Sequence, residues 1–89
     1  MKLSTPLFDL YSNSVKSGEK PRIYIVVGTT ISKKAVDRNL IKRRVRAVLK
    51  GLEVSRLIRT VKIIAKPPIL LAKFSDIKKT IELNWPKIL

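Results

Sequence analysis

The sequence contains no cysteine and no histidine, and it is poor in acids, with six Asp and Glu against twenty Lys and Arg. Without cysteine and histidine there is no disulfide framework, no Cys/His zinc site and no histidine-based catalytic triad. The scattered acids predict no carboxylate cluster for two-metal cleavage of a phosphodiester, and the scattered glycines predict no phosphate-binding loop. Serine–lysine chemistry stays open, although nothing in the sequence marks such a pair. We expect neither a catalytic residue nor a metal site in this chain.

Long hydrophobic runs are also missing. No run approaches the roughly 20 apolar residues of a membrane-spanning helix, and residues 1–6 lack the apolar region of a signal peptide. Hydrophobic residues still make up 45% of the 89 residues, which is enough to build a core. No linker or internal repeat divides the chain. We therefore expect one domain over residues 1–89, cytoplasmic and without a membrane partner.

Positive charge is what the chain has in excess. Its formal net charge is +14 at pH 7. A small folded domain with this charge repels itself unless something anionic offsets it. The composition therefore favours a domain that binds nucleic acid.

Three strands are predicted from β-branched and alternating segments, at residues 6–12, 22–31 and 60–66, with a loop over 13–21. In the first strand, Phe8 is expected in the core and Tyr11 on the opposite side. Pro67-Pro68 ends the third strand, and Gly28 indicates a bulge or a close backbone approach in the second, with the bulge favoured. The expected core face of the second strand consists of Ile23, Ile25, Val27, Thr29 and Ile31.

Two helices are predicted from apolar residues at helical spacing. The first runs from Asp37, as the N-terminal cap, to Lys50, with Gly51 just past its end. The second begins at Ser75 as a cap and ends before Pro86. Their expected apolar stripes are Ile41, Val45, Val48, Leu49 and Leu52, and then Ile77, Ile81, Trp85 and Ile88. This order predicts an α/β fold, an α+β two-layer sandwich with the helices packed on a small sheet.

The first predicted helix has a basic side. Residues 33–50 hold eight of the twenty basic residues and a single acid, Asp37. The charge admits three interpretations: a solvated helix face, a helix on an anionic membrane surface, or a surface for nucleic acid. Arginines that fork onto phosphates, and few acids to pair with them, favour nucleic acid. The residues expected on this side are Arg38, Asn39, Lys42, Arg43, Arg46 and Lys50, with Arg44 beyond the other edge of the apolar stripe.

The spacing of these residues resembles the bacterial ribonuclease P protein component. The resemblance lies in Ser32-Lys33-Lys34 after a strand, then Arg38-Asn39, Lys42-Arg43 and Arg46 on a helix, and it extends over residues 7–85. Three features depart from the family. Leu40 stands where the motif has its second arginine, and the stretch between Lys34 and Ala35 is shorter than usual, which would alter the turn from strand to helix. The amphipathic helix that usually precedes the first strand is missing from this sequence.

The resemblance implies a small sheet with a left-handed strand–helix–strand crossover and a C-terminal helix. It implies that the protein joins a catalytic RNA that removes the 5′ leader from precursor tRNA, that magnesium is held by the RNA, and that one protein copy is present. Tyr11 is the implied stacking residue for the leader. Whether Tyr24 has a role in RNA binding or only a structural one stays open. The implied RNA-binding residues are Lys33, Lys34, Arg38, Asn39, Lys42, Arg43, Arg44, Arg46 and Lys50.

Two alternatives stay open beside this hypothesis. One is a stand-alone RNA- or ribosome-binding module that uses the basic helix without a role in cleavage. The other is a DNA-binding protein that places the helix in a major groove, although the sequence has neither a helix-turn-helix nor a sign of two-fold symmetry.

Overall fold

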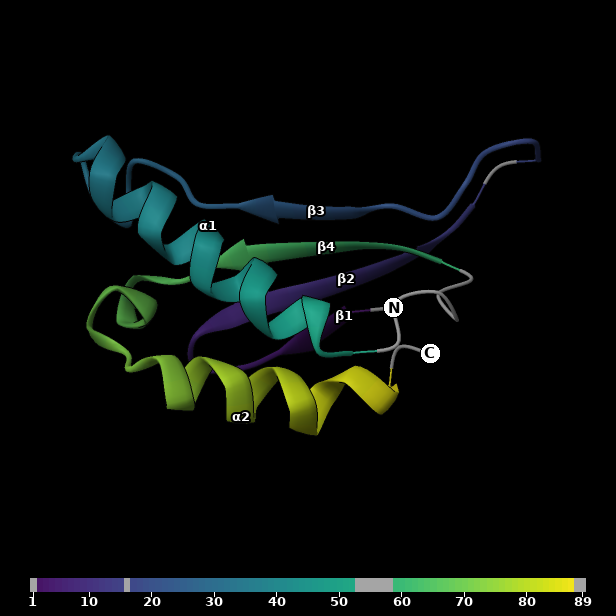
Figure 1. Cartoon of the computed structure of the whole chain (residues 1–89). Helices are drawn as coiled ribbons and strands as arrows, with labels where there is room; N and C mark the ends of the chain where they lie inside the picture. The colour runs from purple at the N-terminus through teal and green to yellow at the C-terminus, as the bar shows by residue number, and fades with distance from the viewer. Residues whose placement is uncertain (1, 16, 53–58, 88–89) are drawn as a thin grey trace.

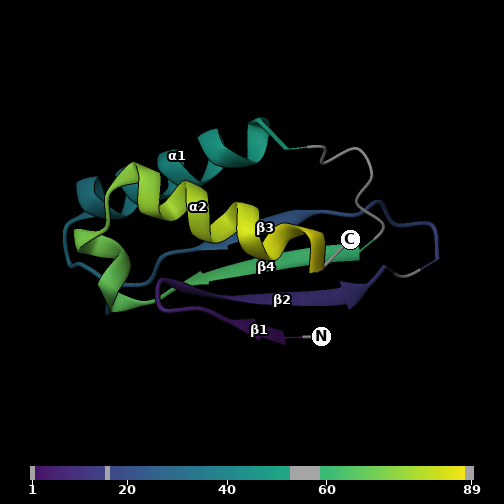
Figure 2. The ribbon, with the colours of Figure 1, turned by 90° about the horizontal axis from the view of Figure 1, so that it is seen from below.

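The computed structural model of the protein describes residues 2–15, 17–52 and 59–87 (Figure 1). A four-stranded sheet forms one layer, and both α-helices lie on the same face of it, as the view from below also shows (Figure 2). The predicted α/β sandwich is therefore confirmed. The elements are β1 (Lys2–Ser4), β2 (Phe8–Ser14), β3 (Ile23–Val26), α1 (Ala35–Lys50), β4 (Arg59–Ala65), the 3₁₀ helix η2 (Pro67–Leu71), α2 (Phe74–Asn84) and the 3₁₀ helix η3 (Trp85–Lys87).

The sheet has the strand order β1-β2-β4-β3. The pairs β1–β2 and β2–β4 are antiparallel, whereas β3 and β4 are parallel. A parallel pair needs a crossover, and α1 provides it. With α1 in front of the sheet and both strands pointing to the left, the chain steps from β3 down to β4, which makes the crossover left-handed (Figure 1). This rare hand, implied by the resemblance, is present in the fold.

The core lies between the sheet and the two helices. The apolar stripe of α1 is buried as predicted at Ile41, Val45, Val48 and Leu49, and Leu52 packs partly buried against it. The predicted core positions of α2 are confirmed, while Ile88 lies outside the described residues. Core residues from the strands, α2 and η3 are Phe8, Leu10, Val61, Ile63, Ile77, Ile81 and Trp85.

The strand prediction is wrong at the N-terminus in two ways. β2 begins at Phe8, and it continues through Asn13 and Ser14, which were assigned to a loop. β1 was not predicted at all. Its turn to β2 is closed by Thr5, whose amide and hydroxyl both donate to the carbonyl oxygen of Phe8, at 2.9 and 2.7 Å. A three-residue strand carries too short a pattern to stand out in the sequence.

The second predicted strand is also too long, because β3 ends at Val26. The amide of Ile31 donates to the carbonyl oxygen of Gly28 at 3.1 Å, so Gly28 opens a turn and does not form a bulge. Thr29 is consequently exposed, whereas Val27 and Ile31 are buried as predicted. The β-branched residues of this turn extended the strand pattern beyond the strand itself.

Both helices begin before their predicted caps. Asp37 is the third residue of α1, and Ser75 is the second residue of α2, so neither is the cap. In α2 the carboxylate of Asp76 accepts the amide hydrogen of Lys73 at 3.3 Å. A carboxylate at the third helical position satisfies an amide at the helix start, and this arrangement replaces the predicted serine cap.

The last strand, β4, begins and ends one residue before the prediction, at Arg59 and Ala65. Pro67 and Pro68 end it as expected, and they open η2. Proline suits the first turn of a helix because its fixed φ is already helical and its missing N–H would have no partner there.

Candidate nucleic-acid interface

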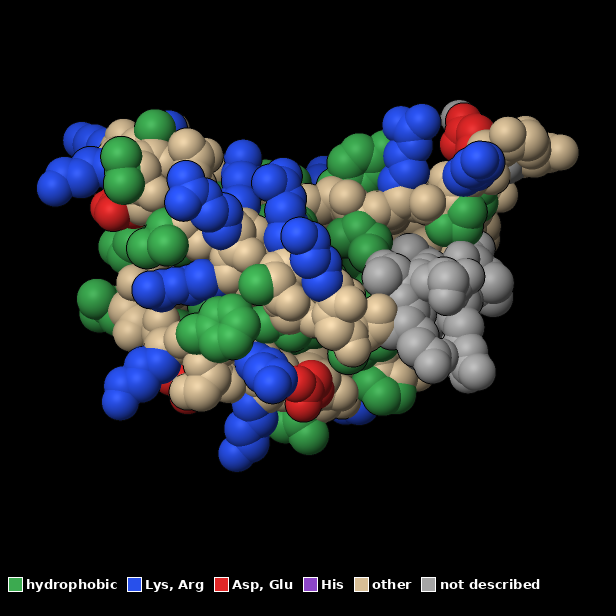
Figure 3. Space-filling view, in the orientation of Figure 1, with side chains coloured by type: hydrophobic (Ala, Val, Ile, Leu, Met, Phe, Trp, Pro, Cys, Tyr) green, Lys and Arg blue, Asp and Glu red, His purple; other side chains and the backbone are tan. Residues whose placement is uncertain are grey.

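The basic side of α1 is directed away from the sheet. Arg43, Arg46 and Lys50 are exposed, as is Asn39, while Arg38 and Lys42 are partly exposed. Blue side chains run along α1 in the space-filling view (Figure 3). We call this set of six residues, Arg38, Asn39, Lys42, Arg43, Arg46 and Lys50, the α1 face.

The positive charge of the α1 face has no acidic counterpart among the described residues. Within residues 2–15, 17–52 and 59–87, the ion pairs join Lys66 to Asp9 and Lys78 to Glu82. Neither pair includes a residue of α1. The carboxylate of Asp37, the acid on this helix, accepts a hydrogen bond from the hydroxyl of Ser32 at 2.9 Å. The α1 face is therefore a surface that suits an anionic partner.

Two arginines of α1 contact backbone carbonyl oxygens of the protein itself. Nη1 of Arg38 donates to the carbonyl oxygen of Ser32 at 2.8 Å, which ties the start of α1 to the turn before it. Nη1 of Arg44 lies 3.5 Å from the carbonyl oxygen of Ala72, on the side of α1 that faces η2 and α2. Lys33 and Lys34 are exposed in the segment before α1. The structure thus separates Arg44 from the α1 face, as its helical phase predicts.

The opposite side of the sheet carries a second basic surface. Lys2 pairs with Tyr11, Tyr11 with Lys62, and Lys62 with Tyr24, so one residue from each strand falls into line. Registered neighbours in a sheet point to the same face. Nζ of Lys2 lies 5.4 Å from the centre of the Tyr11 ring, and Tyr24 is 47% exposed. We call Lys2, Tyr11, Lys62 and Tyr24 the outer row.

The outer row is the part of the interface that sequence reasoning mostly missed. The resemblance implies a stacking role for Tyr11 and leaves the role of Tyr24 open, but nothing in the sequence marks Lys2 or Lys62 as binding residues. Four residues from four strands have no common spacing in the sequence. Only the alternation within each strand was available, and the registers were not.

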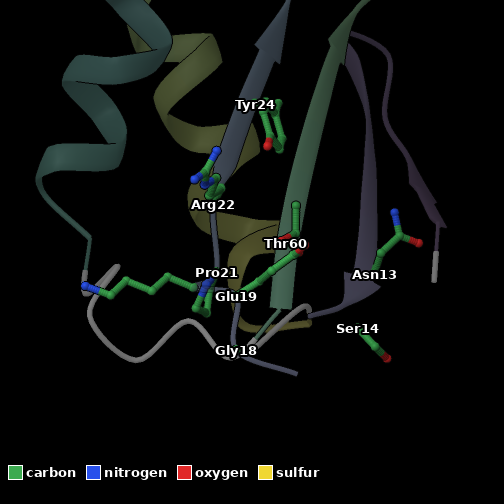
Figure 4. Close-up of a pocket in the computed structure, with 9 residues that line it drawn as sticks. Asn13, Ser14, Gly18, Glu19, Pro21, Arg22, Tyr24 and Thr60 are labelled. Carbon is green, nitrogen blue, oxygen red and sulfur yellow. The ribbon is translucent and has the colours of Figure 1, made fainter. Parts of the chain in front are cut away.

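A hollow of about 740 Å³ adjoins the outer row where β2 ends and β3 begins (Figure 4). Tyr24 of β3 lies on one side of it, with Arg22 just before the same strand, Thr60 on the neighbouring strand β4 and Asn13 on β2 beyond it. Gly18, which has a φ of +85°, lets the β2–β3 loop turn over this hollow. The lining offers a ring, an amide, a hydroxyl and a guanidinium, and it also includes Lys20 and the acid Glu19. The ring, the amide and the cations are groups that bind the bases and phosphates of a single strand.

A polar cluster holds β1 to the rest of the sheet. Nζ of Lys66 donates to the hydroxyl of Ser4 at 2.7 Å and lies 3.1 Å from the carboxylate of Asp9. The hydroxyl of Ser4 donates to the same carboxylate at 2.8 Å. The hydrogen bond from Ser4, and then that from Lys66, lowers the pKa of Asp9 below its ordinary value of 3.8. This cluster fixes the strand that supplies Lys2 to the outer row.

No three acidic side chains in residues 2–15, 17–52 and 59–87 gather into a group that could hold a metal ion. No helix in these ranges is long and apolar enough to cross a membrane.

Comparison with known proteins identifies the family. A family model described as Ribonuclease P matches residues 1–89. The chain belongs to this family. Among curated relatives, the ribonuclease P protein component of Cyanothece sp. (strain PCC 7425 / ATCC 29141) is 50% identical over 40 residues, which make up 45% of this chain and 30% of that relative. The aligned segment thus covers less than one third of the relative's length.

Ribonuclease P proteins of known structure share the whole fold. The Staphylococcus aureus protein superposes with a TM-score of 0.83 at 25% identity, covering 99% of this chain and 82% of that one. A mutant of the S. aureus protein with defective mRNA degradation activity has a TM-score of 0.82 at 22% identity, over 100% and 76% of the two chains. The second likeness concerns the fold alone.

One position sets this chain apart from the motif of the ribonuclease P family. Leu40 occupies the place of the second motif arginine, and it is 42% exposed on α1. Val36, one turn earlier on the helix, is 77% exposed. The start of α1 therefore presents an apolar edge beside the basic residues of the α1 face.

Proposed function

We propose that this chain is the protein subunit of ribonuclease P, an endoribonuclease made of RNA and protein that removes the 5′ leader of precursor tRNA. The observation that carries the proposal is the family match over residues 1–89. The uncompensated cations of the α1 face support it, because RNA is the polyanion of such a particle.

The two basic surfaces suggest a division of labour. The α1 face, with Lys33, Lys34 and Arg44 beside it, binds the catalytic RNA. The outer row and the adjoining hollow bind the single-stranded leader. Stacking on aromatic rings and neutralisation of phosphates are the usual means of holding a single strand. Tyr11 and Tyr24 supply the rings, and Lys2 and Lys62 supply the charge.

Catalysis in this proposal belongs to the RNA. The RNA holds the magnesium ions that activate water and stabilise the leaving oxygen. The protein supplies no catalytic group. Its cations offset the repulsion between the two RNAs, so that fewer magnesium ions are needed to bring them together. One copy of the protein serves one particle, and the particle works in the cytoplasm.

Leader cleavage tests the proposal. The catalytic RNA from the same organism is mixed with a precursor tRNA at low magnesium, with and without the protein. We expect a large rise in cleavage with the protein present and none from the protein alone. Cleavage that does not rise, while salt-sensitive RNA binding persists, would contradict the proposal and favour a stand-alone RNA-binding module.

A further inference from the structure

A groove of about 240 Å³ opens between β3 and the C-terminal half of α1. Its walls are apolar: Ile23 and Ile25 of β3 are partly buried, and Leu49 of α1 is 6% exposed. Arg46 and Lys50 complete the lining, and they belong to the α1 face. The groove thus joins an apolar surface to two cations that are one helical turn apart.

One wall of the groove is an open strand edge. β3 is the last strand in the order β1-β2-β4-β3, so among the described residues it pairs with β4 alone. The amide of Val61 donates to the carbonyl oxygen of Arg22 at 2.9 Å. In a parallel ladder, Tyr24 and Val26 then also turn their amide or carbonyl groups toward β4. The N–H and C=O groups of Ile23 and Ile25 point to the other edge, where the described part of the chain places no strand.

We infer that this groove takes one unstacked nucleobase of the RNA bound by the α1 face, an inference that rests on the function proposed above. A phosphate does not suit apolar walls, because burial strips its water without replacing those hydrogen bonds. A base has two apolar faces and a polar edge. The faces lie against Leu49 and Ile25, and the edge meets the free backbone groups of β3.

The rim of the groove selects RNA over other occupants. A base in the groove leaves its flanking phosphates beside Arg46 and Lys50, where charge-assisted hydrogen bonds form. A second copy of the chain is disfavoured, because each copy carries a formal net charge of +14. An acidic peptide that adds a fifth strand to β3 is the competing occupant.

Filling the groove tests the inference. Ile25→Phe adds a ring at the groove without changing the charge, and phenylalanine suits a strand. We expect the affinity for the catalytic RNA to fall about tenfold, the low end of what one base contact contributes. The slope of log K against log salt stays unchanged, because no phosphate contact is lost. Ile23→Phe fills the groove from the neighbouring position and serves as a second variant.

The matched control is Leu83→Phe, which adds the same ring at a position of α2 that is 64% exposed. We expect wild-type affinity for the catalytic RNA from this variant. Circular dichroism melts show which variants are folded. Chemical probing of the catalytic RNA adds a second readout: an unpaired base that the wild-type protein protects becomes reactive with Ile25→Phe.

The inference and the proposed function fail in different ways. If both groove variants are folded and bind the RNA as the wild type does, while Arg43→Ala weakens binding, the groove is overturned and the α1 face stands. A second outcome would also overturn the inference. If the groove variants bind the RNA as the wild type does, and an acidic β-branched peptide binds the wild type but not Ile25→Phe, the groove is a peptide site. If the wild type shows no salt-dependent affinity for the catalytic RNA, both proposals fall.

Discussion

The α1 face and the outer row put positive charge on opposite sides of the sheet, but they are built in different ways. On α1, cations recur at spacings of three and four residues, so one helix positions them all. The outer row takes one residue from each of four strands, and only the strand registers bring these residues into line. The first surface is a local property of the sequence. The second is a property of the tertiary fold, and it is lost with any strand.

The core beneath α1 supports both surfaces, so a charge placed there has the largest effect. We expect Leu49→Asp to unfold the protein, because losing a buried leucine and burying an unpaired carboxylate costs about 4 kcal/mol or more. That is comparable to the whole stability of a domain this small. Circular dichroism and thermal melts measure the loss. Ala47→Asp, exposed on the same helix, should keep the fold, and equal damage from both would mean that the helix faces are misassigned.

Removing one arginine tests the contribution of the α1 face without changing the outer row. Arg43→Ala should weaken binding to the catalytic RNA about tenfold, since a hydrogen bond to a charged group contributes about 1.5–3 kcal/mol. The salt dependence should become shallower by about 0.7–0.9 in slope. Affinity measured at several salt concentrations checks both values. Arg44→Ala, on the other side of the helix, should lose less, and an equal loss would extend the RNA surface toward η2 and α2.

Removing one aromatic ring tests the contribution of the outer row without changing the α1 face. Tyr24→Ala should weaken binding of a precursor tRNA with a leader about tenfold, given about 1–3 kcal/mol per stacked base. Binding of the same tRNA without a leader should not change. Tyr24→Phe keeps the ring and should bind as the wild type does. If both tRNAs lose affinity equally, the outer row does not contact the leader.

The smallest expected effect concerns the polar cluster of Ser4, Asp9 and Lys66, which holds β1 to the rest of the sheet. The pKa of Asp9 is lowered in the folded protein, so its carboxylate stabilises the fold above its ordinary pKa of 3.8. This contribution is lost as the pH falls through the lower folded value. We expect urea unfolding to show a wild-type advantage over Asp9→Asn at neutral pH that shrinks below pH 3.8. An advantage that does not change with pH would exclude ionisation of Asp9 as its source.

The elements that sequence reasoning predicted well are those whose pattern is local and long. The apolar stripe of the first helix repeats over about three turns, so the sequence alone places Ile41, Val45 and Val48 in the core. The same reasoning placed the α1 face and set Arg44 apart. It did not place the exact start of α1, because Asp37 is the third residue of the helix and accepts a hydrogen bond from Ser32 across the turn instead of capping the helix.

What sequence reasoning could not supply depends on contacts between distant residues. β1 is three residues long and becomes a strand only because Lys66 and the Thr5 turn hold it against β2. The outer row needed the pairing of β2 with β4, which are about fifty residues apart in the chain. The groove needed the edge position of β3. None of these relations leaves a periodic signal.

The strand order also leaves β3 more weakly held than the two central strands. β3 pairs with one neighbour, from which it is separated in sequence by the whole of α1, while β2 and β4 are paired along seven residues each. Local opening costs the least where a strand has few partners. Amide hydrogens of β3 should therefore exchange with solvent before those of β2 and β4. A ligand bound between β3 and α1 would slow that exchange. Binding of RNA would then stabilise the pairing of β3 with β4.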